Sequence, residues 1–167
     1  MLDRIRNHPR AAALLADVFD FDVTRTDPVE PVRLASGVAP VPIAGDASGG
    51  TFFDCGGPVG YASSEGSAGL LGKDLASALE LVVGIPVWHD VASAAPDLDA
   101  MRAEFEAAFA EYAAEFEPEI AEHQAEVVAA LGIAAVPAEE LLARFRDCLA
   151  DRDHVLRNAD GDEFEPL

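Results

Sequence analysis

The sequence predicts an α+β fold with a small antiparallel sheet over about residues 41–73, flanked by helices, and a helical C-terminal half. Two observations lead to this prediction. Between residues 41 and 73, short apolar runs alternate with glycine-rich turns, which is the pattern of antiparallel hairpins. After residue 97, apolar residues recur at steps of three and four, the period of a helix. The 167 residues are expected to form a single domain with a helical extension from about residue 97.

The N-terminal segment is predicted to be helical over residues 3–19 and interrupted at Pro9, because proline starts a helix more readily than it continues one. Residues 22–40 contain three prolines and are expected to run as an extended connection. Within that connection, Val32 and Leu34 are candidates for a short edge strand.

The sheet is predicted from four short strands, over residues 41–44, 51–55, 59–63 and 68–72. The turns between them contain glycine, which tolerates the backbone angles of tight connections. A helix over residues 75–83 follows, because Asp74 is a good N-terminal cap and Gly84 and Pro86 mark the end.

The second half contains the clearest helical stripe of the chain, which is expected to face the core: Leu98, Met101, Phe105, Phe109, Tyr112 and Phe116. The glutamates off this stripe should be solvated. Two further helices are predicted to begin at Pro118 and Pro137, and the first should stop at Gly132. The acidic tail from Asp160 is expected to fray.

The net charge is −20, and residues 97–167 contain nineteen of the 31 acidic residues but only five of the eleven basic ones. This sign argues against nucleic-acid binding, which depends on neutralising phosphates. It favours a basic protein partner, attracted by a force that salt suppresses. The alternative is that the charge serves solubility alone.

No apolar run approaches the about 18 residues that a membrane span needs, so we expect a cytoplasmic protein that does not bind membranes. Cys55 and Cys148 are expected to be reduced thiols. The histidines and cysteines lack metal-ligand spacing, and the chain has no GxSxG or HExxH motif. We therefore expect no catalytic residue, no cofactor and no metal ion. The oligomeric state is left open.

Six residues are candidates for partner binding: Asp46, Glu65, Trp88, Glu104, Glu111 and Glu115. Asp46 lies in the glycine turn GDASGG, where capping of the turn is favoured over a metal or phosphate site. Trp88 is expected to pack over a sheet edge, with an interface anchor as the alternative. Glu111 and Glu115 are one helical turn apart and repel, which favours a use for their charge.

Residues 42–90 contain a pattern with four features: Pro42-Ile43-Ala44 before Asp46, Gly49-Gly50 before Phe52-Phe53, a strand ending near Ser64-Glu65, and a helix over 75–83 that leads to Pro86 and Trp88. This pattern resembles the SUKH superfamily of Smi/Knr-like proteins, many of which are bacterial immunity proteins. The resemblance implies a central antiparallel sheet flanked by helices, and a non-enzymatic protein that neutralises a cognate toxin, often a nuclease, by binding it.

The sequence therefore predicts an immunity-type protein that sequesters a basic toxin through an acidic surface and exposed apolar anchors. Two alternatives stay open. One is a regulatory scaffold that binds cellular partners. The other is a small hydrolase built from Ser63, Ser64 or Ser67 and distant partners, since catalytic triads assemble across a fold.

Overall fold

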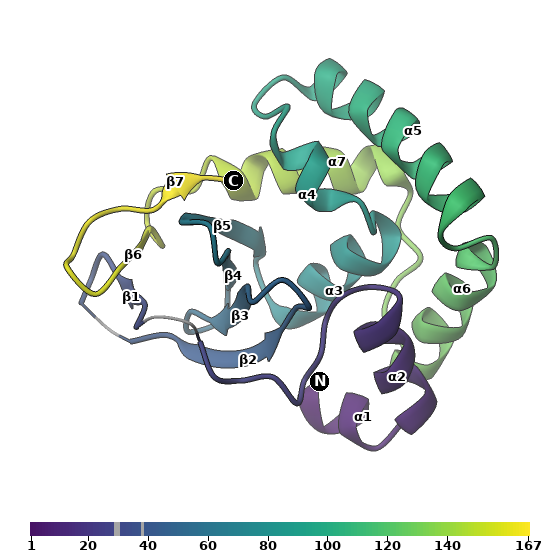
Figure 1. The fold of residues 1–167 in the computed structure, drawn as a ribbon, viewed down its shortest axis with the longest axis horizontal. Coiled ribbons are helices and arrows are strands. Elements are labelled where there is room, and N and C mark those ends of the chain that lie inside the picture. The colour runs from purple at the N-terminus through teal and green to yellow at the C-terminus, as the bar shows by residue number, and fades with distance from the viewer. Residues whose placement is uncertain (29–30, 38) are drawn as a thin grey trace.

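A β-sheet occupies one end of the molecule and most of the helices occupy the other, as the computed structural model in Figure 1 shows for residues 1–28, 31–37 and 39–167. Among these described residues the main sheet has the order β2-β3-β4-β5-β7. Its strands are β2 (Val41–Gly45), β3 (Thr51–Asp54), β4 (Val59–Ala62), β5 (Ser67–Gly72) and β7 (Glu165–Pro166). The first four are antiparallel neighbours in chain order. The predicted α+β class and its hairpins are confirmed.

The C-terminal tail departs from the prediction. It was expected to fray from Asp160, but β7 pairs in parallel with β5, with Ser67 opposite Glu165 and Ala68 opposite Pro166. Residues at the end of a chain become ordered when an open strand edge accepts their backbone hydrogen bonds. Here the Glu165 N–H donates to the Gly66 carbonyl at 3.0 Å.

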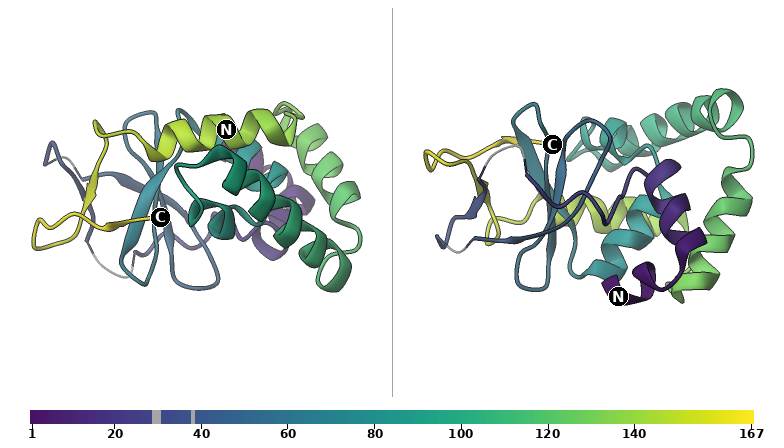
Figure 2. Two further views of the ribbon diagram at one scale, coloured as in Figure 1. Left: turned by 90° about the horizontal axis from the view of Figure 1, so that it is seen from above. Right: turned by 60° about the horizontal axis from the view of Figure 1, so that its bottom comes forward.

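Successive side chains on a strand point to opposite faces of the sheet. Both faces of this sheet are apolar and both are covered by other elements. Phe52 and Tyr61 join the larger apolar core under the helices, whereas their neighbours Phe53 and Ala62 join a second cluster on the far face. That second cluster is closed by a two-stranded sheet of β1 (Arg33–Leu34) and β6 (Leu156–Arg157) (Figure 2). The expected short strand is found at Arg33–Leu34, without Val32, and it pairs with a distant segment in a separate sheet rather than at an edge of the main one.

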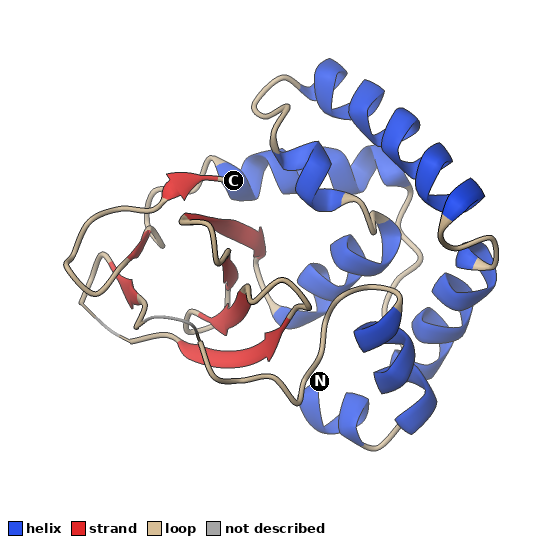
Figure 3. Cartoon of the chain, viewed as in Figure 1, coloured by secondary structure: helices blue, strands red, loops and turns tan. Residues whose placement is uncertain are grey.

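The helices gather on one side of the sheet rather than flanking it on both, as Figure 3 shows. They are α1 (Leu2–Arg6), α2 (Pro9–Asp17), α3 (Leu75–Gly84), α4 (Trp88–Ala92), α5 (Leu98–Glu115), α6 (Ile120–Leu131) and α7 (Ala138–Leu149). Helices α3 and α7 pack on β5, while α5 packs on α4 and α7 in an outer layer. No helix among the described residues combines the length and apolarity needed to cross a membrane.

Helix ends follow the expected caps, with two corrections. Asp74 caps α3 in a capping box with Ser77, and Gly132 ends α6 in the left-handed conformation at φ 59°. Gly84 was predicted to stop α3, yet it is the last helical residue, and a side chain there would collide with Leu141 of α7. The two proline-started helices begin slightly later than predicted, because Pro137 is the residue before α7 and α6 begins at Ile120.

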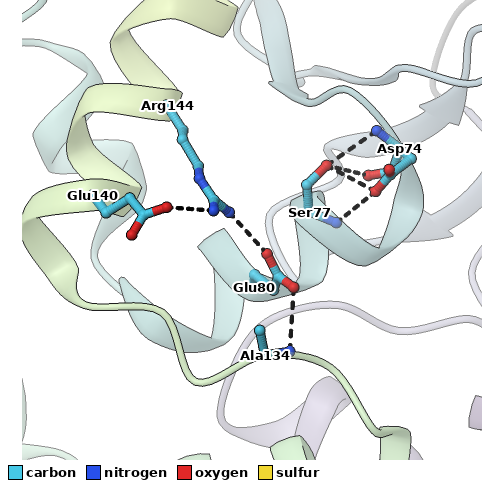
Figure 4. A network of polar contacts seen from close by, with 6 residues as sticks. All are labelled: Asp74, Ser77, Glu80, Ala134, Glu140 and Arg144. Atoms are coloured by element: carbon cyan, nitrogen blue, oxygen red, sulfur yellow. Dashed lines mark hydrogen bonds and ion pairs between the residues drawn. The ribbon is translucent and has the colours of Figure 1, made fainter.

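A polar network fixes α3 against α7 and against the loop that precedes α7 (Figure 4). Glu80 of α3 accepts a hydrogen bond from the Ala134 backbone at 3.2 Å and pairs with Arg144 of α7 at 3.1 Å. Arg144 also pairs with Glu140 on its own helix. The side chain of Glu80 is largely buried, so this pairing compensates a carboxylate held away from water.

Candidate binding site

Asp46 is buried in the structure, with only 2% of its surface exposed, so it is not available to a partner. Its carboxylate accepts hydrogen bonds from the Tyr61 hydroxyl, from the Ser48 hydroxyl at 2.9 Å and from the Gly50 N–H at 2.7 Å. The expected turn-capping role is confirmed, whereas the prediction that Asp46 contacts a partner is wrong, because the residue is buried. Burial raises the pKa of Asp46, but these hydrogen bonds outweigh burial and hold the pKa below its ordinary value of 3.8.

Trp88 is also buried, at 2% exposure, and belongs to the core. Its ring meets Tyr61 edge-on with centroids 5.0 Å apart and stacks against His89 at 3.5 Å. Trp88 therefore packs on the sheet as predicted, but over the interior strands β3 and β4 rather than over an edge, and its burial argues against the interface-anchor alternative. Trp88 opens α4, a five-residue helix that the sequence analysis missed because a segment that short has too few residues to show a period.

Glu65 is exposed in the turn between β4 and β5, so it lies on the sheet and not on α5. The serines beside it hold that turn: Ser63 and Ser67 share a hydrogen bond of 2.9 Å, and Ser64 donates to the Ser48 carbonyl. Among the described residues no serine hydroxyl is hydrogen-bonded to a histidine. Nor do any three His, Cys, Asp or Glu side chains in these residues form a group able to hold a metal ion.

The remaining three candidates, Glu104, Glu111 and Glu115, are all exposed on α5. Spacings of seven and four residues place them in one row along the helix. From residue 103 to residue 143 the sequence has ten glutamates and neither lysine nor arginine. In the described parts of the chain, the ion pairs of α5 are those of Arg102 with Asp99 and Glu139, at the other end of the row. The row therefore has no cation of its own.

The apolar stripe of α5 is less buried than predicted. Met101 is fully buried, but Leu98, Phe105, Phe109 and Tyr112 are only half-buried and Phe116 is 69% exposed. The reason is length. Helix α5 has 18 residues, whereas α4, which packs antiparallel to it, has five. The C-terminal part of α5 therefore extends beyond the helix that covers it, along the outer edge of the molecule (Figure 1).

A groove of about 330 Å³ lies between the start of α4 and the part of α5 from Glu104 onwards. Its apolar lining comes from α5, from the residue after α5 and from the residue before α4: Ala107, Ala108, Tyr112, Phe116 and Val87. Three carboxylates line it as well, from Asp90, Glu104 and Glu111. Two predicted contact residues thus meet at one site, and Asp90 joins them. Sequence reasoning missed Asp90 because nothing in a sequence indicates that α4 lies beside α5.

Tyr112 gives the groove a fixed aromatic wall. Its hydroxyl donates a hydrogen bond to the Val18 carbonyl at 2.8 Å, and its ring stacks near Phe116 with centroids 6.4 Å apart. Burial raises the pKa of the Tyr112 hydroxyl, and the negative charges of Glu117 and Asp20 raise it further. The hydroxyl therefore remains a neutral donor, and its surroundings have a negative potential.

The site joins an aromatic wall to three carboxylates that have no ion pair in the described residues, an arrangement that can contact a cationic side chain. Comparison with known proteins does not assign a class: no family model matches the chain, and no curated protein or solved structure matches it significantly.

Proposed function

We propose that this chain is a cytoplasmic, non-enzymatic binding protein that neutralises a basic protein partner, such as a nuclease toxin, by covering its working surface. The observation that carries the proposal is the row of three exposed glutamates on α5, which form no ion pair in the part of the chain that the structure describes, next to the exposed ring of Phe116. Like charges one turn apart on a helix are unfavourable in isolation. A basic partner would turn this cost into attraction.

Two further observations support the proposal. The antiparallel strands β2 to β5, followed by α3, are compatible with the central antiparallel sheet that the resemblance to SUKH immunity proteins implies. The row is also carried by a regular helix, α5, which is anchored to the core by the buried Met101 and the half-buried Phe105, Phe109 and Tyr112. A preorganised surface loses less conformational entropy on binding.

The experiment is a capture of partners from a lysate of the organism of origin with three tagged proteins. These are the wild type, the variant Glu104→Lys/Glu111→Lys/Glu115→Lys, and the control Asp153→Lys/Asp160→Lys/Asp162→Lys. Both variants change the net charge by the same amount, and the control side chains are exposed and form no ion pair in the described residues. Only the position of the charge differs.

We expect the wild type and the control to retain one basic protein at low salt, and the α5 variant to lose it. The purified partner should bind at 1:1, lose its toxic activity when bound, and associate more slowly as salt rises. Equal capture by all three proteins, or weak recovery of many cellular proteins, would contradict the proposal and favour the scaffold alternative.

A further inference from the structure

The groove between α4 and α5 has a composition that matches one kind of side chain. Its wall is aromatic and aliphatic, and carboxylates from both helices open into it, Asp90 from α4 and Glu104 and Glu111 from α5. A ligand that fits must therefore present a cation and a flat or apolar surface at the same point. Among protein side chains, arginine does both, because its planar guanidinium stacks on aromatic rings while it pairs with carboxylates.

We propose that this groove receives an arginine side chain of the basic partner, with the guanidinium between the carboxylates and its flat face against Tyr112 and Phe116. This inference rests on the proposed function for the identity of the partner, but the fit of the groove to arginine can be measured without it. A positively charged arginine would be attracted to the groove at short and at long range. The carboxylates of the groove have no ion pair in the described residues, and the whole chain has a net charge of −20.

The aromatic wall strengthens the argument. The Tyr112 ring is held in place by its hydrogen bond to Val18, and Phe116 is the most exposed large apolar side chain in the described residues. Exposed aromatic rings beside unpaired carboxylates gain by being covered, since the ring leaves water and the carboxylates gain a cation. Arginine anchors of this kind are enriched among the residues that dominate protein interfaces.

The direct test uses small probes and NMR spectra of the ¹⁵N-labelled chain. The first probe is acetyl-Leu-Arg-Leu-amide, and its control is the same peptide with citrulline, which keeps the shape and removes the charge. We expect the arginine peptide to shift the amide signals of Ala107, Ala108, Tyr112 and Phe116 at millimolar concentration, and the citrulline peptide to shift them far less.

Two charge-matched variants locate the effect. Glu104→Gln/Glu111→Gln removes carboxylates of the groove, and Glu106→Gln/Glu122→Gln removes two exposed glutamates that do not line it. The first should abolish the shifts and the second should preserve them. Shifts spread over many glutamates, or shifts that survive in the groove variant, would overturn the inference and reduce the binding to general charge attraction.

The partner, once captured, provides a second test. Glu104→Gln/Glu111→Gln and Phe116→Ala should each weaken its binding by about tenfold or more. The control Val41→Ala removes another exposed apolar side chain, 61% exposed on β2, and should leave affinity unchanged. Unchanged affinity in the groove variants would reject the groove as the arginine-binding site but would leave the proposed function intact. A groove that binds the arginine peptide, in a chain that captures no partner, would reject the function while the groove stands.

Discussion

The carboxylate of Asp46 and the glutamates of α5 show two opposite uses of one chemical group. Asp46 is buried, and both of its carboxylate oxygens accept hydrogen bonds from donors within the fold. Its negative charge is therefore compensated internally and is not available to a partner. Glu104, Glu111 and Glu115 are exposed and have no cation in the described residues, so their charge stays available. Burial and pairing, rather than residue type, separate a structural carboxylate from one that can meet a partner.

The aromatic residues divide in the same way. Trp88 fills the core among Tyr61, Phe52 and Phe145, whereas Phe116 lies in the open at the end of α5. Changes in the first group should therefore affect folding, and changes in the second should affect binding. The predictions below test this division, beginning with the largest effect.

Trp88→Ala should lower the free energy of unfolding by about 3–5 kcal/mol, because it leaves a large cavity in the core. Phe116→Ala should change it by less than about 1 kcal/mol, since most of that ring is already in water. Urea denaturation of both variants measures the difference. A comparable loss in the two variants would mean that the C-terminal part of α5 is packed as tightly as the core.

Asp46→Asn should cost about 1–3 kcal/mol, because the Tyr61 hydroxyl and the Gly50 N–H lose a charged acceptor. The variant should also change the response to acid. Since the pKa of Asp46 is lower in the folded protein than its ordinary 3.8, the wild type gains stability from this group above pH 3.8 and loses it as pH falls through the folded pKa. The Asn variant should lack this part of the acid-induced loss.

Urea midpoints between pH 2.5 and pH 6 test this prediction. Asp153→Asn, at an exposed carboxylate without an ion pair in the described residues, is the control and should follow the wild type at every pH. A difference between wild type and Asp46→Asn that stays constant across the range would show that the charge of Asp46 does not stabilise the fold.

Glu115→Gln should stabilise the protein slightly, by about 0.5 kcal/mol, because it removes repulsion with Glu111 and a negative charge from the C-terminal end of a helix. The gain should fade in 1 M salt, where such interactions are screened. Thermal unfolding at low and high salt measures it. Glu106→Gln is the control and should give no gain in stability, because Glu106 lies four residues after Arg102 on the same helix, where opposite charges attract. An equal gain in this variant would show that the repulsion is not particular to Glu111 and Glu115.

Most of the local elements could be predicted from the sequence. The antiparallel strands over residues 41–72 and the capped start of α3 follow from turn chemistry and side-chain period, which act between residues close in the chain. The exposure of the α5 glutamates follows from the same period. Of the six candidate residues, four are exposed as a partner contact requires: three on α5, and Glu65 in the turn between β4 and β5. The other two, Asp46 and Trp88, are buried.

The sequence by itself determined the fold class, the helical period of α5 and the excess of negative charge, because each is a property of neighbouring residues or of composition. Only the tertiary structure decided that β7 joins β5, that β1 pairs with β6, that Asp46 and Trp88 are buried, and that α4 is too short to cover α5. These outcomes depend on which distant segment arrives at an open edge or face. The groove with Asp90, Glu104 and Glu111 exists for that reason, since two helices must meet before their carboxylates share one site.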